Sequence, residues 1–458
     1  MSRKSFVRRV WLNVPAGEVF AWHARPGAFE RLQPPWERVE VVDRTRGIKD
    51  GAQVALLVRV GPFRKRWTLV HRDYVADRQF CDEQLEGPFR FWRHTHRTVP
   101  EGERRCYLED KIEYELPLGP AGELLGGRFF RRKLNRTFDH RHRIMVQDLK
   151  VHGQNKTRGP MRVLVSGASG LVGSALTAFL TTGGHTVLRL VRSKTADGIS
   201  EIYWNPSGVV DTSNLDGLDA VVHLAGENLA EGQWTDEKKQ RIRESRVGGT
   251  RLLSETLACL PRPPKALVCA SAVGYYGDRG DEALTEDSGP GSGFLAEVCR
   301  EWELASEVAS KNGIRVVNLR LGMVLTPAGG ALAKMLPPFR FGLGGRLSSG
   351  NQYMSWISLE DVVGAIYHAV VTENLSGAVN GVAPHPVTNA EFTTTLGRVL
   401  RRPTVFSVPV SALRRTFGEM ADALLLASTR AEPAALAASG YRFRHRELEI
   451  ALRQTLGK

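Results

Sequence analysis

The feature that most constrains this chain is the segment 161–193, MRVLVSGASGLVGSALTAFLTTGGHTVLRLVRS. A short apolar run ends at Val165 and leads into Gly167-Ala-Ser-Gly170-Leu-Val-Gly173, and the pattern then predicts a helix and, past Gly183-Gly184, a second strand. Glycines at this spacing allow a tight turn, a close backbone approach to a pyrophosphate, and close packing of helix on strand. The first amides of the helix would face the phosphate oxygens. The segment therefore predicts a dinucleotide-binding βαβ unit.

Length and composition bound the class of protein. At 458 residues the chain exceeds the size at which one hydrophobic core keeps growing, so two or more domains are expected. No run of about 18 apolar residues occurs, and the opening MSRKSFVRRVWLNVP lacks the apolar core of a signal peptide. The five cysteines form no Cys-x-x-Cys pair, which is typical of reduced thiols rather than a disulfide frame or a zinc site. We therefore expect a cytoplasmic protein.

The basic charge is concentrated in the first third of the chain. Residues 1–160 contain 32 Lys and Arg against 20 Asp and Glu, a net charge of +12, whereas the other 298 residues contain 31 against 29, a net charge of +2. An acidic partner, a membrane surface or a nucleic acid would fit this charge. A solvated surface fits it more simply, so neither nucleic-acid nor membrane binding is predicted. The sequence assigns no oligomeric state.

The polar stretch GQNKTRGP, residues 153–160, has no apolar periodicity and predicts a linker. It would follow a front domain over residues 1–152. In that front segment, a helix is predicted from Pro15 to Trp22 and a second one over 23–32. Alternating residues predict strands at 6–14, 37–44, 53–60, 64–74, 79–86, 89–99 and 104–115. A long helix over about 120–146 closes the segment, with apolar residues at helical spacing at Leu124, Leu125, Phe129, Leu134, Phe138 and Met145.

This order of elements, with the opening VWLNVPAGEVFAW, resembles the START-like polyketide cyclase and lipid-binding superfamily, which has an α+β helix-grip fold. The resemblance implies that the long helix covers a curved sheet and leaves a cavity for a hydrophobic ligand. Phe129, Phe130 and Phe138 would point toward that interior. His94 and His96 share one face of an alternating strand, but no third ligand is evident. We therefore expect an ordinary sheet face there and no metal site.

From Met161 onward, predicted strands and helices alternate. The strands lie at 162–166, 186–191, 219–224, 266–270, 314–320 and 378–382, and the helices at 171–182, 236–259, 293–312 and 359–371. This alternation predicts an α/β domain, a doubly wound parallel Rossmann sheet with its ligand at the carboxyl ends of the strands.

Several motifs in this half resemble an atypical extended short-chain dehydrogenase/reductase of the NAD(P)-binding "epimerase family". They are HLAGEN at 223–228, SAVGYYG at 271–277, the stretch 342–363, and PVTNAEF at 386–392. Proteins of this kind end in a small helical domain. The resemblance therefore implies a Rossmann domain over 161–385 and a substrate-side C-terminal helical domain over 386–458.

The cofactor expected here is NADP, with NAD the less favoured alternative. The turn would surround the pyrophosphate with Gly167, Ser169, Gly170, Leu171, Val172 and Gly173. At the end of the second strand, where NAD proteins carry an acid for the ribose, this chain has Val191 and Arg192, and the first acid, Asp197, comes later. An arginine can pair with the 2′-phosphate of NADP. The resemblance adds Leu224, Ala225, Gly226, Arg246 and the backbone near Val324 as further contacts.

The expected catalytic pair is absent. Members of the resembled family use Tyr-x-x-x-Lys, in which lysine lowers the pKa of the tyrosine so that it can exchange a proton near neutral pH. Here Phe294 and Val298 occupy those positions, and neither can donate a proton. Tyr276, or its neighbour Tyr275, could act as the acid, with Ser271 polarising a carbonyl. Both tyrosines could equally be packing residues.

Two hypotheses of function follow. The first is oxidoreductase or epimerase chemistry on a small substrate, favoured by the substrate-side stretch 342–363. The second is an NADP-dependent sensor or regulator without catalysis, favoured by the loss of the Tyr/Lys pair.

Overall fold

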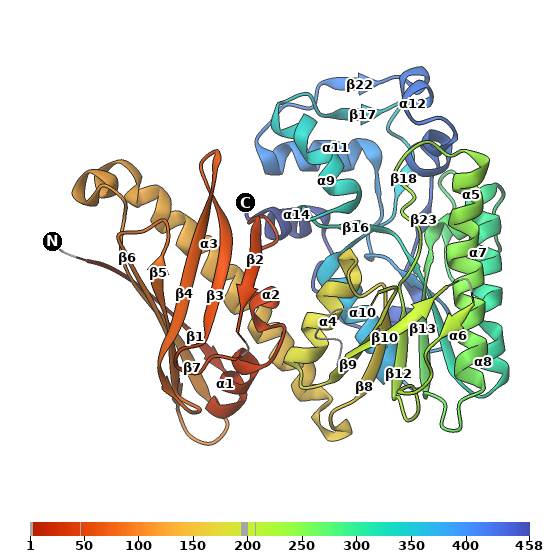
Figure 1. Ribbon diagram of the computed structural model, residues 1–458. Coiled ribbons are helices and arrows are strands. Elements are labelled where there is room, and N and C mark those ends of the chain that lie inside the picture. Colours follow the sequence, from red (N-terminus) through yellow and green to blue (C-terminus); the bar gives the residue numbers. More distant parts are fainter. Residues whose placement is uncertain (1–2, 46, 194–199, 207) are drawn as a thin grey trace. The chain divides into compact units, whose positions relative to one another are not determined.

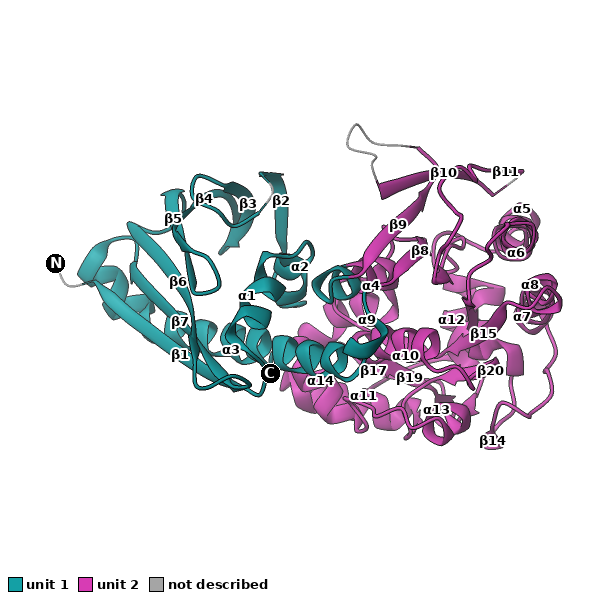
Figure 2. Cartoon of the chain, turned by 90° about the horizontal axis from the view of Figure 1, so that it is seen from below, with its two compact units in different colours: residues 1–160, 178–184, 457 teal, residues 161–177, 185–456, 458 magenta. Residues whose placement is uncertain are grey.

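The computed structural model describes residues 3–458 apart from 46, 194–199 and 207 (Figure 1). The chain divides into two compact units (Figure 2). The first unit comprises residues up to 160 together with 178–184 and 457, and the second comprises 161–177, 185–456 and 458. No helix among the described residues is both long and apolar enough to cross a membrane.

The first unit contains a seven-stranded antiparallel sheet in the order β1-β7-β6-β5-β4-β3-β2. Its strands are β1 (Lys4–Leu12), β2 (Val39–Arg44), β3 (Gln53–Val60), β4 (Phe63–Val75), β5 (Gln79–Glu86), β6 (Phe91–Pro100) and β7 (Cys106–Glu115). Buried and partly exposed residues alternate strictly along β7, as expected of a sheet with one covered face. Each of these strands agrees closely with the range predicted for it from alternation.

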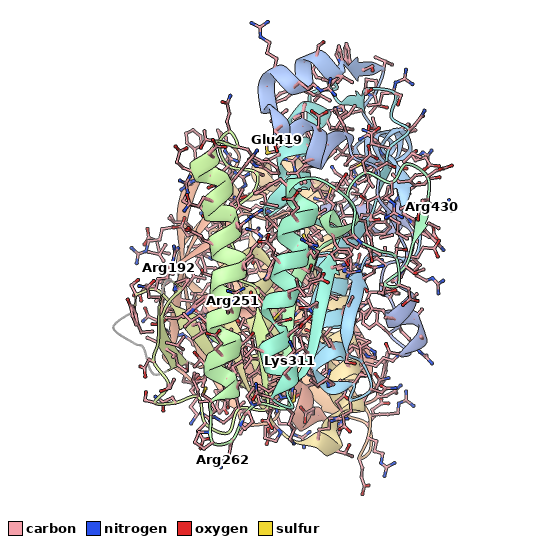
Figure 3. All side chains as sticks on the ribbon, turned by 90° about the vertical axis from the view of Figure 1, so that its right-hand side faces the viewer. Arg192, Arg251, Arg262, Lys311, Glu419 and Arg430 are labelled. Carbon is pink, nitrogen blue, oxygen red and sulfur yellow. The ribbon has the colours of Figure 1, made fainter. Side chains whose placement is uncertain are left out.

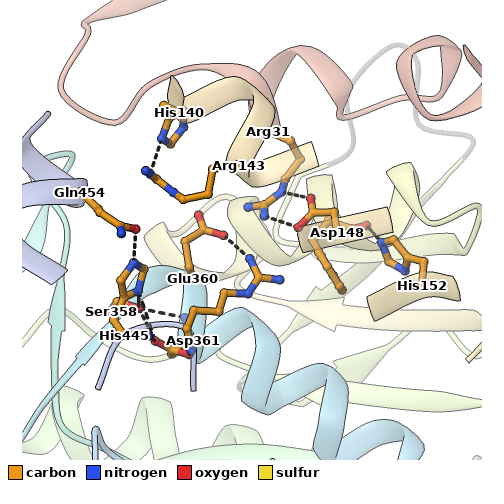
Figure 4. A network of polar contacts seen from close by, with 12 residues as sticks. Arg31, His140, Arg143, Asp148, His152, Ser358, Glu360, Asp361, His445 and Gln454 are labelled. Atoms are coloured by element: carbon orange, nitrogen blue, oxygen red, sulfur yellow. Dashed lines mark hydrogen bonds and ion pairs between the residues drawn. The ribbon is translucent and has the colours of Figure 1, made fainter. Parts of the chain in front are cut away.

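Three helices belong to this sheet: α1 (Ala16–Ala24), α2 (Ala28–Leu32) and α3 (Gly119–Gln154), followed by a short 3-10 turn, Lys156–Arg158. Helix α3 supplies Leu134 and Phe138 to the core on the sheet. A buried, bidentate ion pair joins α2 to α3, because Arg31 donates to both carboxylate oxygens of Asp148 at 2.7 and 2.8 Å (Figure 4). This is the helix-grip arrangement implied by the sequence resemblance.

Two expectations about α3 were wrong. The helix continues to Gln154, so part of the predicted linker is helical. Leu124, Leu125 and Phe129 are largely exposed, although they were placed on the covered face. The buried stripe runs through Phe138 and Leu134 at four-residue spacing. At about 100° per residue, the three exposed residues fall roughly 80–180° away from Leu134 around the helix.

The second unit is built on an eight-stranded sheet in the order β11-β10-β9-β8-β12-β13-β15-β20. Its strands are β8 (Arg162–Ser166), β9 (Thr186–Val191), β10 (Glu201–Asn205), β11 (Val209–Val210), β12 (Ala220–His223), β13 (Ala266–Ala272), β15 (Arg315–Leu321) and β20 (Gly377–Gly381). All neighbouring pairs are parallel except β10 with β11. The central strands are almost wholly buried, as in a sheet covered on both faces. The doubly wound sheet is confirmed, but β10 and β11 were not anticipated.

Helices flank this sheet in chain order: α4 (Leu171–Thr182), α5 (Asp236–Arg243), α6 (Gly249–Ala258), α7 (Phe294–Ala305), α8 (Glu307–Lys311) and α10 (Leu359–Val371). One π turn, Glu244–Gly248, joins α5 to α6, so the predicted helix 236–259 is continuous. Figure 3 shows α6 and the α7–α8 pair side by side, with the charged side chains of Arg251 and Lys311 on their outer surface.

The remaining helices form a smaller part of the second unit. They are α9 (Gly330–Arg340), α11 (Asn389–Leu400), α12 (Val410–Phe417), α13 (Ala434–Ala438) and α14 (Leu448–Leu456), with a π turn at Ala421–Leu426. Short strand pairs accompany them: β14 (Ala283–Leu284) with β23 (Arg430–Ala431), β16 (Met323–Leu325) with β19 (Trp356–Ser358), β17 (Gly345–Leu347) with β22 (Phe406–Val408), and β18 (Tyr353–Met354) with β21 (Val387–Thr388). Residues of α9, α11 and α14 share one apolar core.

A buried polar network fixes the C-terminal segment to the start of α10 (Figure 4). Ser358, the N-cap of α10, donates to the Asp361 carboxylate at 2.8 Å. The same carboxylate accepts from the backbone amides of Arg444 and His445 at 2.7 and 3.0 Å. His445 also contacts Ser358 Oγ through Nδ1 at 2.8 Å. Because Ser358, Asp361 and His445 are buried, this network specifies how the last segment of the chain returns to the sheet.

Candidate nucleotide-binding site

The glycine turn between β8 and α4 has the geometry that its sequence requires. Gly167 has φ +66°, a conformation that side chains other than glycine rarely adopt, and a Cβ there would lie 2.9 Å from the Leu224 carbonyl. A Cβ on Gly173 would lie 2.2 Å from the Gly167 carbonyl oxygen, and one on Gly170 would lie 3.2 Å from it. Gly167 therefore packs against the end of β12 and Gly173 against the turn, and at these two positions only glycine fits.

Two buried side chains that the sequence analysis missed hold the ends of β8 and β12 together. Ser166 Oγ accepts from the amides of Leu224 and Ala225 at 3.0 and 3.2 Å and lies 2.6 Å from His223 Nδ1. Since the hydroxyl already accepts twice, it donates its proton to Nδ1, and the imidazole is neutral. Burial lowers the pKa of His223 to about 4, in agreement. Each is the last residue of its strand, which is the signal that could have identified them.

Arg246, in the π turn between α5 and α6, contacts the backbone after β12 that is predicted to border the nucleotide. Its guanidinium donates to the Glu227 carbonyl at 3.0 Å and to the Ile242 carbonyl at 3.3 Å. A Cβ on Gly226 would lie 3.3 Å from the guanidinium carbon, so the arginine lies directly against this glycine. Burial lowers the pKa of Arg246. The structure therefore places Arg246 against Gly226 and Glu227, and its contact with a nucleotide stays a prediction.

The other predicted contacts lie on separate elements. Arg192 directly follows β9 and its side chain is exposed (Figure 3). Asp197 lies outside the described residues. Val324 lies in β16, paired with Ile357 of β19 rather than with the main sheet. Leu171, at the start of α4, is close to the loop before α9, since a Cβ on Gly329 would lie 3.3 Å from its side chain.

Ser271 and Tyr276 belong to one buried polar network. Ser271 donates to Glu303 at 2.7 Å, and Arg320 donates to both oxygens of the same carboxylate at 2.9 and 2.8 Å. Tyr276 is fully buried, lies 2.7 Å from Asn380 Oδ1, and accepts from Arg320 at 2.9 Å. Burial raises the pKa of its phenol. These contacts join the end of β13 to β15 and β20. They favour a packing role for Tyr276, which is the second of the two roles that the sequence left open.

Phe294 and Val298, which occupy the positions of the missing Tyr/Lys pair, pack mainly against apolar side chains. Val298 is buried in a cluster with Trp234, Ile242 and Met420, and the ring of Phe294 packs 5.5 Å from that of Trp234. The Lys239 ammonium also lies 5.5 Å from the centroid of the Phe294 ring.

Comparison with known proteins divides the chain in the same way. Residues 163–380 match the profile of the NAD dependent epimerase/dehydratase family, 408–455 a domain of unknown function (DUF1731), and 12–140 the polyketide cyclase / dehydrase and lipid transport family. The "Epimerase family protein Mb2239" of Mycobacterium bovis is 50% identical over 291 residues, which are 63% of this chain and 96% of that protein. The chain belongs to the epimerase family.

Two solved structures extend this assignment. One is described as the nucleoside-diphosphate sugar epimerase from Corynebacterium glutamicum; it is 34% identical with a TM-score of 0.80, covering 99% of this chain and 90% of that one. The other is the human epimerase family protein SDR39U1 with NADPH, 35% identical with a TM-score of 0.61, covering 65% of this chain and 99% of that one. The match to the Corynebacterium protein therefore spans both units of the chain, whereas the match to the human protein covers about two thirds of it.

Proposed function

We propose that this epimerase family protein binds NADP(H) at the glycine turn after β8 and uses it in oxidoreductase or epimerase chemistry on a small substrate. The observation that carries the proposal is the close approach of Gly167 and Gly173 to neighbouring backbone. Such a turn exposes the first amides of α4 to a pyrophosphate without side chains in the way. The NADPH bound by the human relative supports the choice of nucleotide.

The contacts proposed for the nucleotide follow from the strand ends. The turn residues 167–173 would hold the pyrophosphate, and Leu224 to Gly226 the adenosine half. Arg192 would pair with the 2′-phosphate, because its side chain is exposed at the end of β9, where an acid selects NAD in related folds. Arg246 would support this backbone, and the backbone near Val324 would border the far side. When bound, the cofactor would supply hydride transfer, and these residues would orient it.

The reaction needs a proton relay other than the usual pair. Phe294 and Val298 lie in an apolar cluster, so the helix α7 offers no phenol at that point. A catalytic role for Ser271 and Tyr276 stays a prediction, and their buried network favours positioning of the strand ends. Sugar nucleotides are a reasonable first class of substrate to test, given the description of the Corynebacterium protein.

A non-catalytic NADP-dependent regulator is the second candidate, and the same apolar cluster favours it. The two functions are separated by incubating the full chain with NADPH or NADP and a panel of sugar nucleotides and small carbonyl compounds. Substrate-dependent change in nicotinamide absorbance, or exchange of solvent hydrogen into the substrate, would support catalysis. Tight NADPH binding without either signal would support the regulator, and absence of NADPH binding would exclude both.

We further propose that the first unit takes up a hydrophobic ligand, in keeping with its polyketide cyclase and lipid transport profile. Aromatic and aliphatic side chains line its interior, among them the partly buried Trp67, Phe89 and Phe130. Uptake of a fluorescent apolar probe by the full chain would support this, and exclusion of such probes would contradict it.

A further inference from the structure

A cluster of titratable side chains lies inside the first unit. It includes His71 on β4, whose Nδ1 is 2.8 Å from Asp82 Oδ1, and His23 on α1, whose ring centroid is 5.7 Å from that of His96. Asp82 lies on β5, His94 and His96 on β6, Asp110 on β7 and His142 on α3. His94 and Asp110 are 3% and 2% exposed, so the cluster is part of the interior. Buried charged groups in proteins are usually paired or bound to a metal. The expectation of an ordinary sheet face therefore misses the main feature of this strand.

Strand register explains the convergence. Asp82 pairs directly with His94 across β5 and β6, and His96 pairs with Asp110 across β6 and β7. Aromatic rings wall the cluster: Phe80 stacks on His96 with ring centroids 4.3 Å apart, and Phe138 lies edge-on to His94 at 5.4 Å. The ring nitrogens are left facing the carboxylates.

Asp82, His94 and His96 each offer one ligand atom, and these three atoms lie within 4.8 Å of one another. Asp82 Oδ2 lies 3.9 Å from His94 Nδ1 and 3.4 Å from His96 Nε2. Ligands of a tetrahedral zinc ion lie about 3.3 Å apart, because each is about 2.0–2.1 Å from the metal. A carboxylate and two imidazoles at this spacing need only small adjustments to share one ion.

The opposite side of each imidazole faces a second carboxylate. Asp110 Oδ1 lies 3.0 Å from His94 Nε2 and 2.7 Å from His96 Nδ1, and Oδ2 lies 2.6 Å from His142 Nε2. Metal-binding histidines commonly direct their second nitrogen to such a carboxylate, which orients the ring. His96 Nδ1 is close to Asp110 but lacks hydrogen-bond alignment among the described residues.

The cluster also holds two carboxylates, Asp82 and Asp110, whose negative charge needs a cationic partner inside the protein. A divalent ion would balance the two carboxylates with every imidazole neutral. Alternatively, a proton on His96 and the nearby Arg141 could balance the two carboxylates, and in that arrangement the protein would take up no metal.

We propose that the first unit binds one divalent first-row transition metal through Asp82 Oδ2, His94 Nδ1 and His96 Nε2. Asp110 is the positioning residue behind both histidines. Imidazole and carboxylate donors suit zinc, iron and cobalt, and three protein ligands leave coordination positions for water or a bound ligand. Asp82 is the most exposed of the three ligands, with 18% of its side chain accessible, and marks the side from which an ion enters.

The test uses the full chain, stripped with a chelator and titrated with Co²⁺ and then Zn²⁺. We expect one Co²⁺ per chain with visible absorption, displaced by Zn²⁺. Asp82→Asn and His96→Gln should each lower affinity at least a hundredfold, and Asp110→Asn about 10–100-fold. His385→Ala is the control, because this histidine is exposed on the second unit and pairs only with Glu447 among the contacts described. Circular dichroism checks that each variant is folded. If His96→Gln and Asp110→Asn do not fold, the affinity of Asp82→Asn alone decides the test, because Asp82 is the most exposed of the three ligands.

The proposal is overturned if the folded, stripped chain takes up neither ion, or if Asp82→Asn and His96→Gln bind Co²⁺ as the unaltered chain does. A folded, stripped chain that takes up no metal, while histidine NMR shows a protonated imidazole in the cluster, would assign the cluster to a buried ion network alone.

Discussion

At the scale of single residues, the structure distinguishes glycines that the fold requires from glycines that it does not. Gly167 needs both its positive φ and its missing Cβ, whereas Gly289 has an ordinary φ and open space around it. Gly167→Ala should therefore lower the free energy of unfolding by about 1–2 kcal/mol and NADPH affinity at least tenfold. Thermal unfolding and fluorescence titration measure the two effects. Gly289→Ala is the matched control and should leave both unchanged, so equal behaviour of the two variants would remove the argument.

His223 should make the free energy of unfolding depend on pH, with a sign that follows from its pKa. Its pKa is about 4 in the folded chain and near 6.5 when unfolded, so the unfolded state binds more protons between these values. Its contribution to stability is complete above pH 6.5 and is lost as the pH falls toward 4. His223→Asn should remove roughly 2 kcal/mol of the loss seen between pH 6.5 and 5. Urea unfolding at both pH values measures it, and parallel losses in the two proteins would contradict the assignment.

Sequence reasoning reached some of these residues and not others, for physical reasons. Glycine spacing is local, so the turn at 167–173 could be predicted. The meeting of Asp82 with His94 depends on strand register, which alternation alone does not give. Asp110 did carry a signal, because it interrupts the inward row of Leu108 and Ile112 on β7 with a charge.

At the scale of elements, strands were predicted better than the orientation of the long helix. Alternation has a period of two and resolves a strand's faces clearly, whereas α3 carries apolar residues on several sides. Its first turns leave Leu124 and Leu125 in solvent. Strand β10 was missed because its short segment, Glu201–Asn205, alternates weakly.

Helix α3 offers a matched pair of substitutions. Leu134 is 5% exposed in the core on the sheet, whereas Leu125 is 83% exposed. Leu134→Arg places an unpaired charge in the core and should cost about 3 kcal/mol or more, enough to unfold the first unit. Leu125→Arg should change stability by no more than about 0.5 kcal/mol. Chemical denaturation of the full chain measures both, and similar effects would refute the assigned orientation of the helix.

At the scale of the whole molecule, the first unit ends at Pro160 apart from residues 178–184 and 457, and we expect a cut between Pro160 and Met161 to leave two independently folding parts. Residues 1–160 and 161–458 should each give cooperative unfolding when expressed alone, and the second fragment should bind NADPH with the affinity of the full chain. Calorimetry and titration measure this. A second fragment that is folded but binds NADPH at least tenfold more weakly would show that the first unit contributes to the nucleotide site.

The measurement that tests the central claim most directly is a titration of the full chain with NADPH and with NADH. Arg192, exposed at the end of β9, should give NADPH at least a tenfold advantage, which is about 1.4 kcal/mol. Arg192→Asp should reverse the order, because a carboxylate repels the 2′-phosphate and accepts from the free ribose hydroxyl. Equal affinities of the unaltered protein for both nucleotides, or an unchanged order in Arg192→Asp, would contradict the account.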